Sequence, residues 1–352
     1  MKNDRNPLAF LLLVPLSLAF LARGDGLSFH PAEGASLTKT FTLESELSLD
    51  EMSVSVNGQD IDPEQFGGME MTTSVKQVIA VTDQYLSLGE GRPSRLKRTF
   101  DELSSTTQVS LNNAMMGNQD ETLTGKSDLE GLAVEFTWNE DQGEYAVAFA
   151  EGSKGKEELL EGLAEDTDLR GFLPEGEVKE GATWSVDVQL LRHVLAPSGA
   201  VKIEPENVSE MMGMQGPQPS MDEMLGEFEG NVTAEYAGTR EEDGVRVAIV
   251  KLKVEVTSAK DATELMQENM EEMELPPEVE MSVDSLDIEY GFEGEGELHW
   301  NLGTGLLHSM SLSGEASMTI DTSMKLHAQG MDQAIENSMT LSGNQSVSVT
   351  SD

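Results

Sequence analysis

The chain has 352 residues, no cysteine and a formal net charge of −43, from 22 Lys and Arg against 65 Asp and Glu. This charge argues strongly against binding to nucleic acid or to anionic membranes. The missing cysteines exclude disulfides, thiol nucleophiles and metal–thiolate centres. An apolar content of 38% is enough for a packed core, and the length fits one large β domain or two smaller ones.

Residues 1–24 have the pattern of an export signal. Two basic residues precede an apolar stretch at 8–22, and small residues at Ala22 and Gly24 predict cleavage before Asp25. The apolar stretch is short for a membrane span. We expect an exported protein, periplasmic or extracellular, with no stable membrane anchor after cleavage. An uncleaved N-terminal anchor is the alternative.

The next part, residues 25–195, is predicted to be an N-terminal β-rich unit. Apolar residues recur at every second position in several runs, which is typical of strands with one buried face. The runs cover 37–56, 72–81, 132–138, 145–149 and 183–190, and leucines at helical spacing predict a short helix at 155–166.

Residues 196–224 are rich in Pro, Gly and Met and are predicted to be a linker or excursion. Met211, Met212 and Met214 lie close together there. Thioethers can bind cuprous copper in an oxidising compartment, so these methionines are one candidate metal site. The simpler interpretation is that flexible methionines cover apolar surface, and on that interpretation the protein has no metal or cofactor.

A C-terminal β-rich unit is predicted for residues 225–352, with a helix at 261–274 and a last strand near 339–349. Its central feature is a long hairpin at 286–320. Alternation is continuous from Leu286 to Leu302, breaks at a glycine-containing loop and resumes as far as Ile320. Such long strands with one solvent-exposed face must twist and coil.

The hairpin carries small residues on its apolar face. With the loop near Gly303, Gly294 and Gly296 lie roughly opposite Gly314 and Ala316. Glycine inside a strand marks a bend or a close approach. We therefore expect a mainly β fold: long, strongly curved antiparallel sheet, half-barrel-like, with short helices covering or filling the concave face, as one continuous sheet or two half-barrels.

The concave face is the predicted ligand site. Glycines there leave a hollow with aromatic and aliphatic side chains around it, which would suit an apolar small molecule, a lipid or a lipidated envelope protein. The predicted contact residues are Tyr290, Phe292, Gly294, Gly296, Leu298, Trp300, Gly314 and Ala316.

Catalytic signatures for zinc proteases, serine hydrolases, phosphate loops and dinucleotide binding are missing, so no catalytic residue and no enzyme activity is predicted. His299 and His308 lie near one end of the hairpin, but strict alternation places them on opposite faces. Arg92, Arg95 and Arg98, with Lys97, form the one basic cluster. It is either an anion site or a set of ion pairs with the surrounding acid.

Three segments resemble a group of secreted bacterial β proteins of unknown function, common in planctomycete-like bacteria. They are GFLPEGEVKEGATWSVDV, DQYLSLGEGRPSRLKRTF and GELHWNLGTGLLHSMSLSGEASMTI. The resemblance implies a secreted β fold and carries over no catalytic position. In shape alone, the predicted curved sheet resembles the half-barrels of lipoprotein carriers of the LolA and LppX type.

Three functions remain open. The first is a non-enzymatic exported protein that shelters an apolar ligand or lipidated partner. The second is a structural or interaction protein of the cell envelope with an acidic, weakly cation-binding surface. The third, least favoured by the sequence, is a hydrolase or copper protein whose site forms only in the folded chain.

Overall fold

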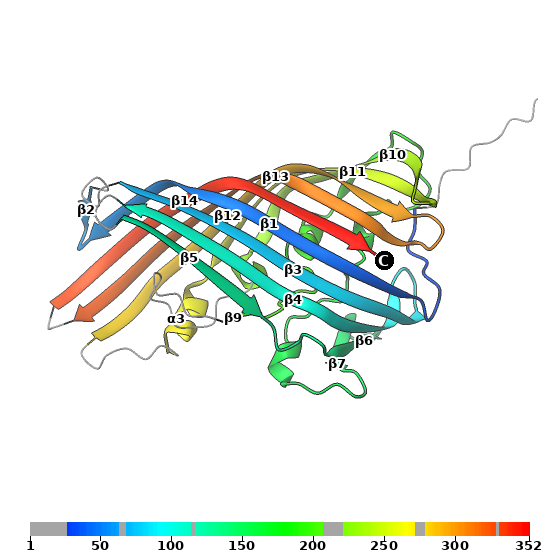
Figure 1. The fold of residues 1–352 in the computed structure, drawn as a ribbon, viewed down its shortest axis with the longest axis horizontal. Helices are drawn as coiled ribbons and strands as arrows, with labels where there is room; N and C mark the ends of the chain where they lie inside the picture. Colours follow the sequence, from blue (N-terminus) through cyan, green and yellow to red (C-terminus); the bar gives the residue numbers. More distant parts are fainter. Residues whose placement is uncertain (1–26, 63–67, 114–116, 207–220, 272–278, 329–330) are drawn as a thin grey trace, which may run out of the picture.

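A computed structural model describes residues 27–62, 68–113, 117–206, 221–271, 279–328 and 331–352. Its strands all belong to one antiparallel sheet in the order β7-β6-β4-β3-β1-β14-β13-β12-β11-β10-β8, with β2, β5 and β9 added at the sides (Figure 1). The strands are β1 Ser36–Val56, β2 Gln59–Ile61, β3 Met69–Leu88, β4 Pro93–Asn113, β5 Gly117–Lys126, β6 Ala133–Asn139, β7 Glu144–Phe149, β8 Thr183–Val186, β9 Glu204–Pro205, β10 Glu227–Glu242, β11 Val245–Asp261, β12 Val279–Asn301, β13 Leu306–Ala328 and β14 Met331–Ser351.

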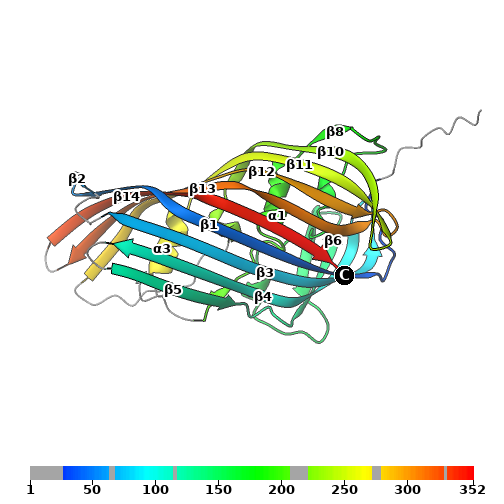
Figure 2. The same ribbon diagram turned by 45° about the horizontal axis from the view of Figure 1, so that its top comes forward.

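The predicted fold class is confirmed: the protein is mainly β, with one large antiparallel sheet that does not close and a few short helices. Of the two arrangements left open, the structure has the single sheet. β1 pairs with β14 from Lys39↔Ser351 to Val56↔Ile335, which joins the N-terminal and C-terminal strands. The long strands arch over the rest of the chain (Figures 1 and 2).

Alternation along the strands gives the sheet two faces of opposite character. On β1, Phe41 and Leu43 are buried, whereas Glu44 and Glu46, which follow them on the alternate positions, are exposed. The face that carries Phe41 is called the inner face here, and the other the outer face. The inner face of the right half in Figure 1 packs against residues 150–206, the inner segment.

The helix predicted at 155–166 is not present in the inner segment, which contains only shorter helical turns. A single 3₁₀ turn, η2 (Glu157–Leu160), replaces it, and Leu163 forms an isolated bridge with Gly199. Glycine at 155 and 162 limits helix growth, and Gly162 has a φ of +70°. The other short elements are η3 Arg170–Phe172, η4 Val188–Leu191, α1 Arg192–Leu195 and α2 Met221–Met224.

The second predicted helix is present as α3 (Thr263–Glu271), and the Asp261 side chain accepts a hydrogen bond from the Thr263 backbone N–H at 2.9 Å, as an N-cap does. It packs beside the N-terminal part of β12 (Figure 1). In the part of the chain that the structure describes, no helix is long and apolar enough to cross a membrane.

The predicted hairpin is β12–β13, closed at Leu302–Gly305. Gly294 pairs directly with Gly314, and Gly296 pairs with Leu312. A side chain at Gly314 would overlap the backbone carbonyl of Glu293 and the Cα of Gly294. A residue larger than glycine would therefore force the backbone to move here, which agrees with the predicted bend or close approach at these glycines.

A cluster of charged side chains fixes the inner segment to the sheet. Arg98 binds both carboxylate oxygens of Asp83 at 2.7 and 2.9 Å and donates to the backbone carbonyls of Ala164 and Glu165. Lys39 bridges Asp83 and Asp168 at 2.7 Å each. These side chains are essentially inaccessible to solvent.

The electrostatics of this cluster favour the charged form of Asp83. Burial alone would raise the pKa of its carboxyl group, but the charges of Arg98 and Lys39 overcome that effect and hold the pKa well below its usual range. Burial has the opposite net result at Glu165, whose pKa is raised although Arg170 binds it. The interior is therefore stabilised by closely paired charges.

Candidate functional site: a polar groove across the outer face

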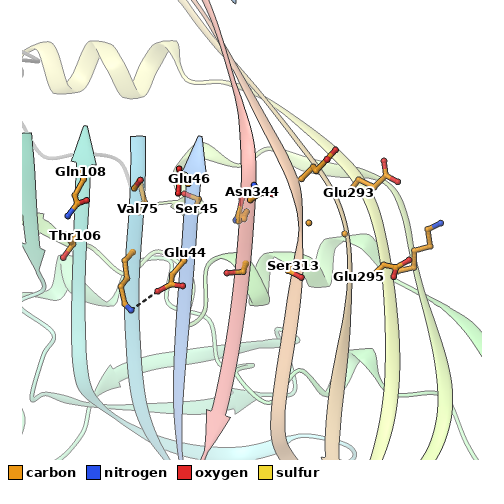
Figure 3. A pocket seen from close by; sticks show the side chains of 18 residues that line it. Glu44, Ser45, Glu46, Val75, Thr106, Gln108, Glu293, Glu295, Ser313 and Asn344 are labelled. Carbon is orange, nitrogen blue, oxygen red and sulfur yellow. Dashed lines mark hydrogen bonds and ion pairs between the residues drawn. The ribbon is translucent and has the colours of Figure 1, made fainter. Parts of the chain in front are cut away.

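Three adjoining hollows form a groove across the outer face of the sheet. The central hollow has a volume of about 1080 Å³ and is lined by strands from β4 to β11 (Figure 3). A second hollow of about 490 Å³ shares Glu293, Glu315 and Asn344 with it. The third, of about 580 Å³, shares Gly291 and Ser317 with the second and reaches β10.

One row of residues, paired in register from β11 to β4, forms the floor of the groove. Each member contributes a side-chain oxygen to the outer face. The row, called the floor row here, is Glu255, Glu293, Glu315, Asn344, Glu46, Ser74 and Gln108. At a strand spacing of about 4.8 Å, it extends roughly 29 Å.

Three carboxylates stand side by side in this row. Glu293 pairs directly with Glu255 on one side and with Glu315 on the other. Like charges directly opposite one another in neighbouring strands are destabilising. The floor row contains no Lys or Arg, so nothing within it offsets this repulsion.

The rest of the groove lining is also mainly negatively charged. The three hollows together are lined by nine glutamates and two lysines, and one of those lysines, Lys76, is bound to Glu44 at 2.8 Å. Figure 3 shows Glu44, Glu46, Glu293 and Glu295 around the central hollow. The groove can therefore supply many hydrogen-bond acceptors and a surplus of negative charge to an extended ligand.

The same geometry disfavours a compact metal site. Carboxylates in successive strands are spread along the row rather than gathered around one point. Among the described residues, no group of three or more His, Asp and Glu is arranged to hold a metal ion. The arrangement suits a ligand that carries several positive charges along its length.

Most of the sequence-predicted ligand residues are buried. Their larger side chains are buried in the core of the inner face: Tyr290 and Phe292 are each 4% exposed, and Trp300 is 0% exposed. Trp300 donates to the backbone carbonyl of Ser28, and Tyr290 donates to Gln345. Leu298 and Ala316 are also in this core, and Gly296 is half-buried.

Five of the predicted residues also line a hollow of the outer groove. Gly294 and Gly314 line the central hollow, Phe292 and Ala316 line the second, and Tyr290 lines the third. Contact of any of the eight residues with a ligand stays a prediction.

The placement of the two histidines on opposite faces is wrong. Ser309 pairs with His299 and Leu307 with Trp300, so His308 is the extra residue of a β-bulge. The bulge turns both imidazoles towards Glu242, whose carboxylate lies 3.3 Å from His299 and 3.5 Å from His308. Arg240 also binds Glu242.

The basic cluster divides into separate roles. Arg98 is buried in the charged cluster with Asp83, and Arg95 pairs with Glu135 at 2.7 Å, as the ion-pair interpretation expects. Arg92 instead stacks on Trp138, with 4.1 Å between the guanidinium carbon and the ring centroid. The predicted export signal at 1–24 and Met211, Met212 and Met214 lie outside the described residues.

The floor row was missed from sequence because each strand supplies one residue, and only the register brings them together. A partial signal existed in the acidic outer positions of β12. The buried charged cluster had a clearer signal, since Lys39 shares its strand face with Phe41 and Leu43.

No protein-family model matches this chain, and no curated protein matches it. Among solved structures, a similarity is found to an outer membrane channel from Pseudomonas putida F1, over 91% of this chain and 97% of that one. The sequence identity is 9% and the TM-score is 0.20. At that TM-score the similarity supports no conclusion about fold or function.

Proposed function

We propose that this protein is an exported, non-enzymatic interaction protein that binds an extended cationic partner along the outer groove. The single observation that carries the proposal is the floor row, in which three glutamates stand in register without a cation. A chain segment rich in Lys or Arg would relieve their repulsion on binding, and its affinity would fall with salt.

The partner class follows from the length and chemistry of the groove. A floor of roughly 29 Å accommodates about eight or nine residues of extended chain. Asn344 between the carboxylates, and Ser74 and Gln108 at the end of the row, can accept hydrogen bonds from peptide N–H groups. A basic segment of another envelope protein therefore fits better than a single small cation.

The test is binding of a fluorescent octalysine peptide, measured by anisotropy at several salt concentrations. A triple variant, E255Q/E293Q/E315Q, removes three charges from the floor row. The matched control, E140Q/D141N/E144Q, removes three exposed charges from the β6–β7 turn. We expect the floor variant to bind about 10-fold more weakly than the control.

Equal loss in both triple variants would mean that the peptide senses only the net charge, and the proposal would fail. Calcium or magnesium that displaces the peptide at millimolar concentration, with loss of binding in the floor variant, would identify small cations as competing occupants of the same groove.

A second candidate function, shelter of an apolar ligand or lipidated partner, is favoured by the inner face at the other end of the sheet. Met52, Met339 and Ile320 pair in register there and are only half-buried. Native mass spectrometry with organic extraction tests it: a co-purifying lipid supports it, and a clean apo mass from the native host counts against it.

A further inference from the structure

A separate cleft of about 840 Å³ lies at the end of the sheet where β3 turns into β4. It is bounded by the N-terminal segment at Leu27 and Phe29, the turn at Gly91 and Arg92, and residues 170–177 of the inner segment. This cleft shares no lining residue with the outer groove. It is therefore a separate candidate site.

Arg92 is the side chain at this cleft that most needs a partner. It makes no side-chain hydrogen bond and no ion pair with any residue in the described ranges, whereas Arg95, Arg98 and Arg170 each bind a carboxylate. An arginine without an acidic partner is unexpected in a chain with 65 acidic residues. Its guanidinium donors face no competing carboxylate at hydrogen-bond distance.

The position of Arg92 is fixed by an aromatic platform. Its guanidinium lies over Trp138 of β6, and Trp138 packs edge-to-face against Tyr145 of β7 at 5.0 Å between centroids. The Tyr145 hydroxyl donates to the backbone carbonyl of Pro93, next to Arg92, at 2.7 Å. Stacking uses the face of the guanidinium and leaves its N–H edge free to bind an anion.

The opposite wall of the cleft is apolar. Leu27, Phe29, Leu173 and Pro174 line it, and Phe29 is held edge-to-face on Tyr85 at 5.8 Å. Arg170 stacks on Phe29, but its donors are used by Glu165 and Asp166. A free guanidinium edge beside an apolar wall suits a ligand with an anionic head and a hydrocarbon tail.

The geometry points to a binding site for a small anionic amphiphile, with its carboxylate or phosphate on Arg92 and its alkyl chain against Leu27, Phe29, Leu173 and Pro174. Two exposed glutamates, Glu175 and Glu177, also line the cleft. Their repulsion selects a ligand with a single, small head group. This inference does not rest on the outer groove.

The experiment titrates the full chain with octanoate, octanamide, butyrate and octyl phosphate by isothermal calorimetry or NMR. Octanoate should bind at least about 10-fold more tightly than octanamide, because only the former has a charged head. Octanoate should also bind more tightly than butyrate, because its chain covers more of the apolar wall. The ratio of octanoate to octyl phosphate affinity identifies the preferred head.

Arg92→Ala should weaken octanoate binding by about the same 10-fold factor, and Arg92→Lys should recover only part of it, because lysine loses the planar fork and the stacking. Arg95→Ala is the matched control: Arg95 lies three residues further along the chain on β4, is exposed and does not line the cleft. E175Q/E177Q should tighten binding.

The inference is overturned if octanoate and octanamide bind equally, if Arg92→Ala binds octanoate as the wild type does, or if none of the four probes binds. Thermal melting of each variant separates a lost site from a lost fold, since Arg92 is outside the core.

Discussion

The two faces of this sheet handle charge in opposite ways. On the inner face, Arg98 and Lys39 meet Asp83 at 2.7 Å with no access to solvent, and the cluster holds the inner segment in place. On the outer face, Glu255, Glu293 and Glu315 stand in adjacent strands with no cation in their row.

The difference reflects the surrounding dielectric. An unpaired charge in the interior would cost several kcal/mol, so buried charges occur in close pairs. Solvent screens the outer row, so three like charges cost only fractions of a kcal/mol each. The inner charges therefore serve folding, and the outer row is the place where we propose that a cationic partner binds.

The largest effect is expected from breaking the inner cluster. Arg98→Met leaves Asp83 buried without its two-point partner and should lower the free energy of unfolding by about 3–5 kcal/mol. Urea unfolding measures the change. Arg95→Ala, which removes an exposed pair with Glu135, should change it by less than about 1 kcal/mol. Equal losses of stability in the two variants would show that the buried and the exposed ion pairs do not differ in this way.

The next largest effect is expected at the bend between the two hairpin strands. Gly314→Val places a side chain against the Glu293 carbonyl and should cost at least about 1–3 kcal/mol, because backbone must move. Gly291→Ala is the control, since its added carbon meets only the Ser317 hydroxyl. A valine at 314 that leaves the thermal midpoint unchanged would show that the bend is not needed.

Acid should weaken the inner cluster at Asp83. Because its folded-state pKa is depressed, Asp83 stabilises the fold above its unfolded pKa of about 3.9, and this stability is lost as pH falls further. The contribution is at most about 1.4 kcal/mol per pH unit. Between pH 4 and 2, the free energy of unfolding should therefore fall more steeply with decreasing pH for the wild type than for Asp83→Asn. Identical slopes would refute this role.

The smallest effect concerns the floor row itself. Glu293→Gln removes the middle charge of three and should raise the free energy of unfolding by about 0.2–1 kcal/mol, more at low salt. Glu289→Gln on the same strand pairs with Ala259 and Thr319, so it should have almost no effect. If Glu293→Gln instead lowers the free energy of unfolding, the Glu293 carboxylate already has a favourable partner in the wild type.

Much of the fold could be predicted because it is encoded locally. Alternation from Leu286 to Ile320 predicts the hairpin, and Gly294 with Gly314 predicts its bend. The floor row could not be predicted in this way, since its residues lie as far apart as Glu46 and Asn344 and meet only through strand register. A single bulge at His308 was enough to reverse the expected face of one histidine.

The most direct test of the proposed role of the groove is to find where a polycation binds. Octalysine would be coupled to the wild-type protein with a carbodiimide, which joins lysine amines to carboxylates in contact with them, and the joined residues would be identified by mass spectrometry. We predict cross-links concentrated at Glu46, Glu255, Glu293 and Glu315. Cross-links spread evenly over the acidic surface, with the floor row no more modified than the β6–β7 turn, would contradict it.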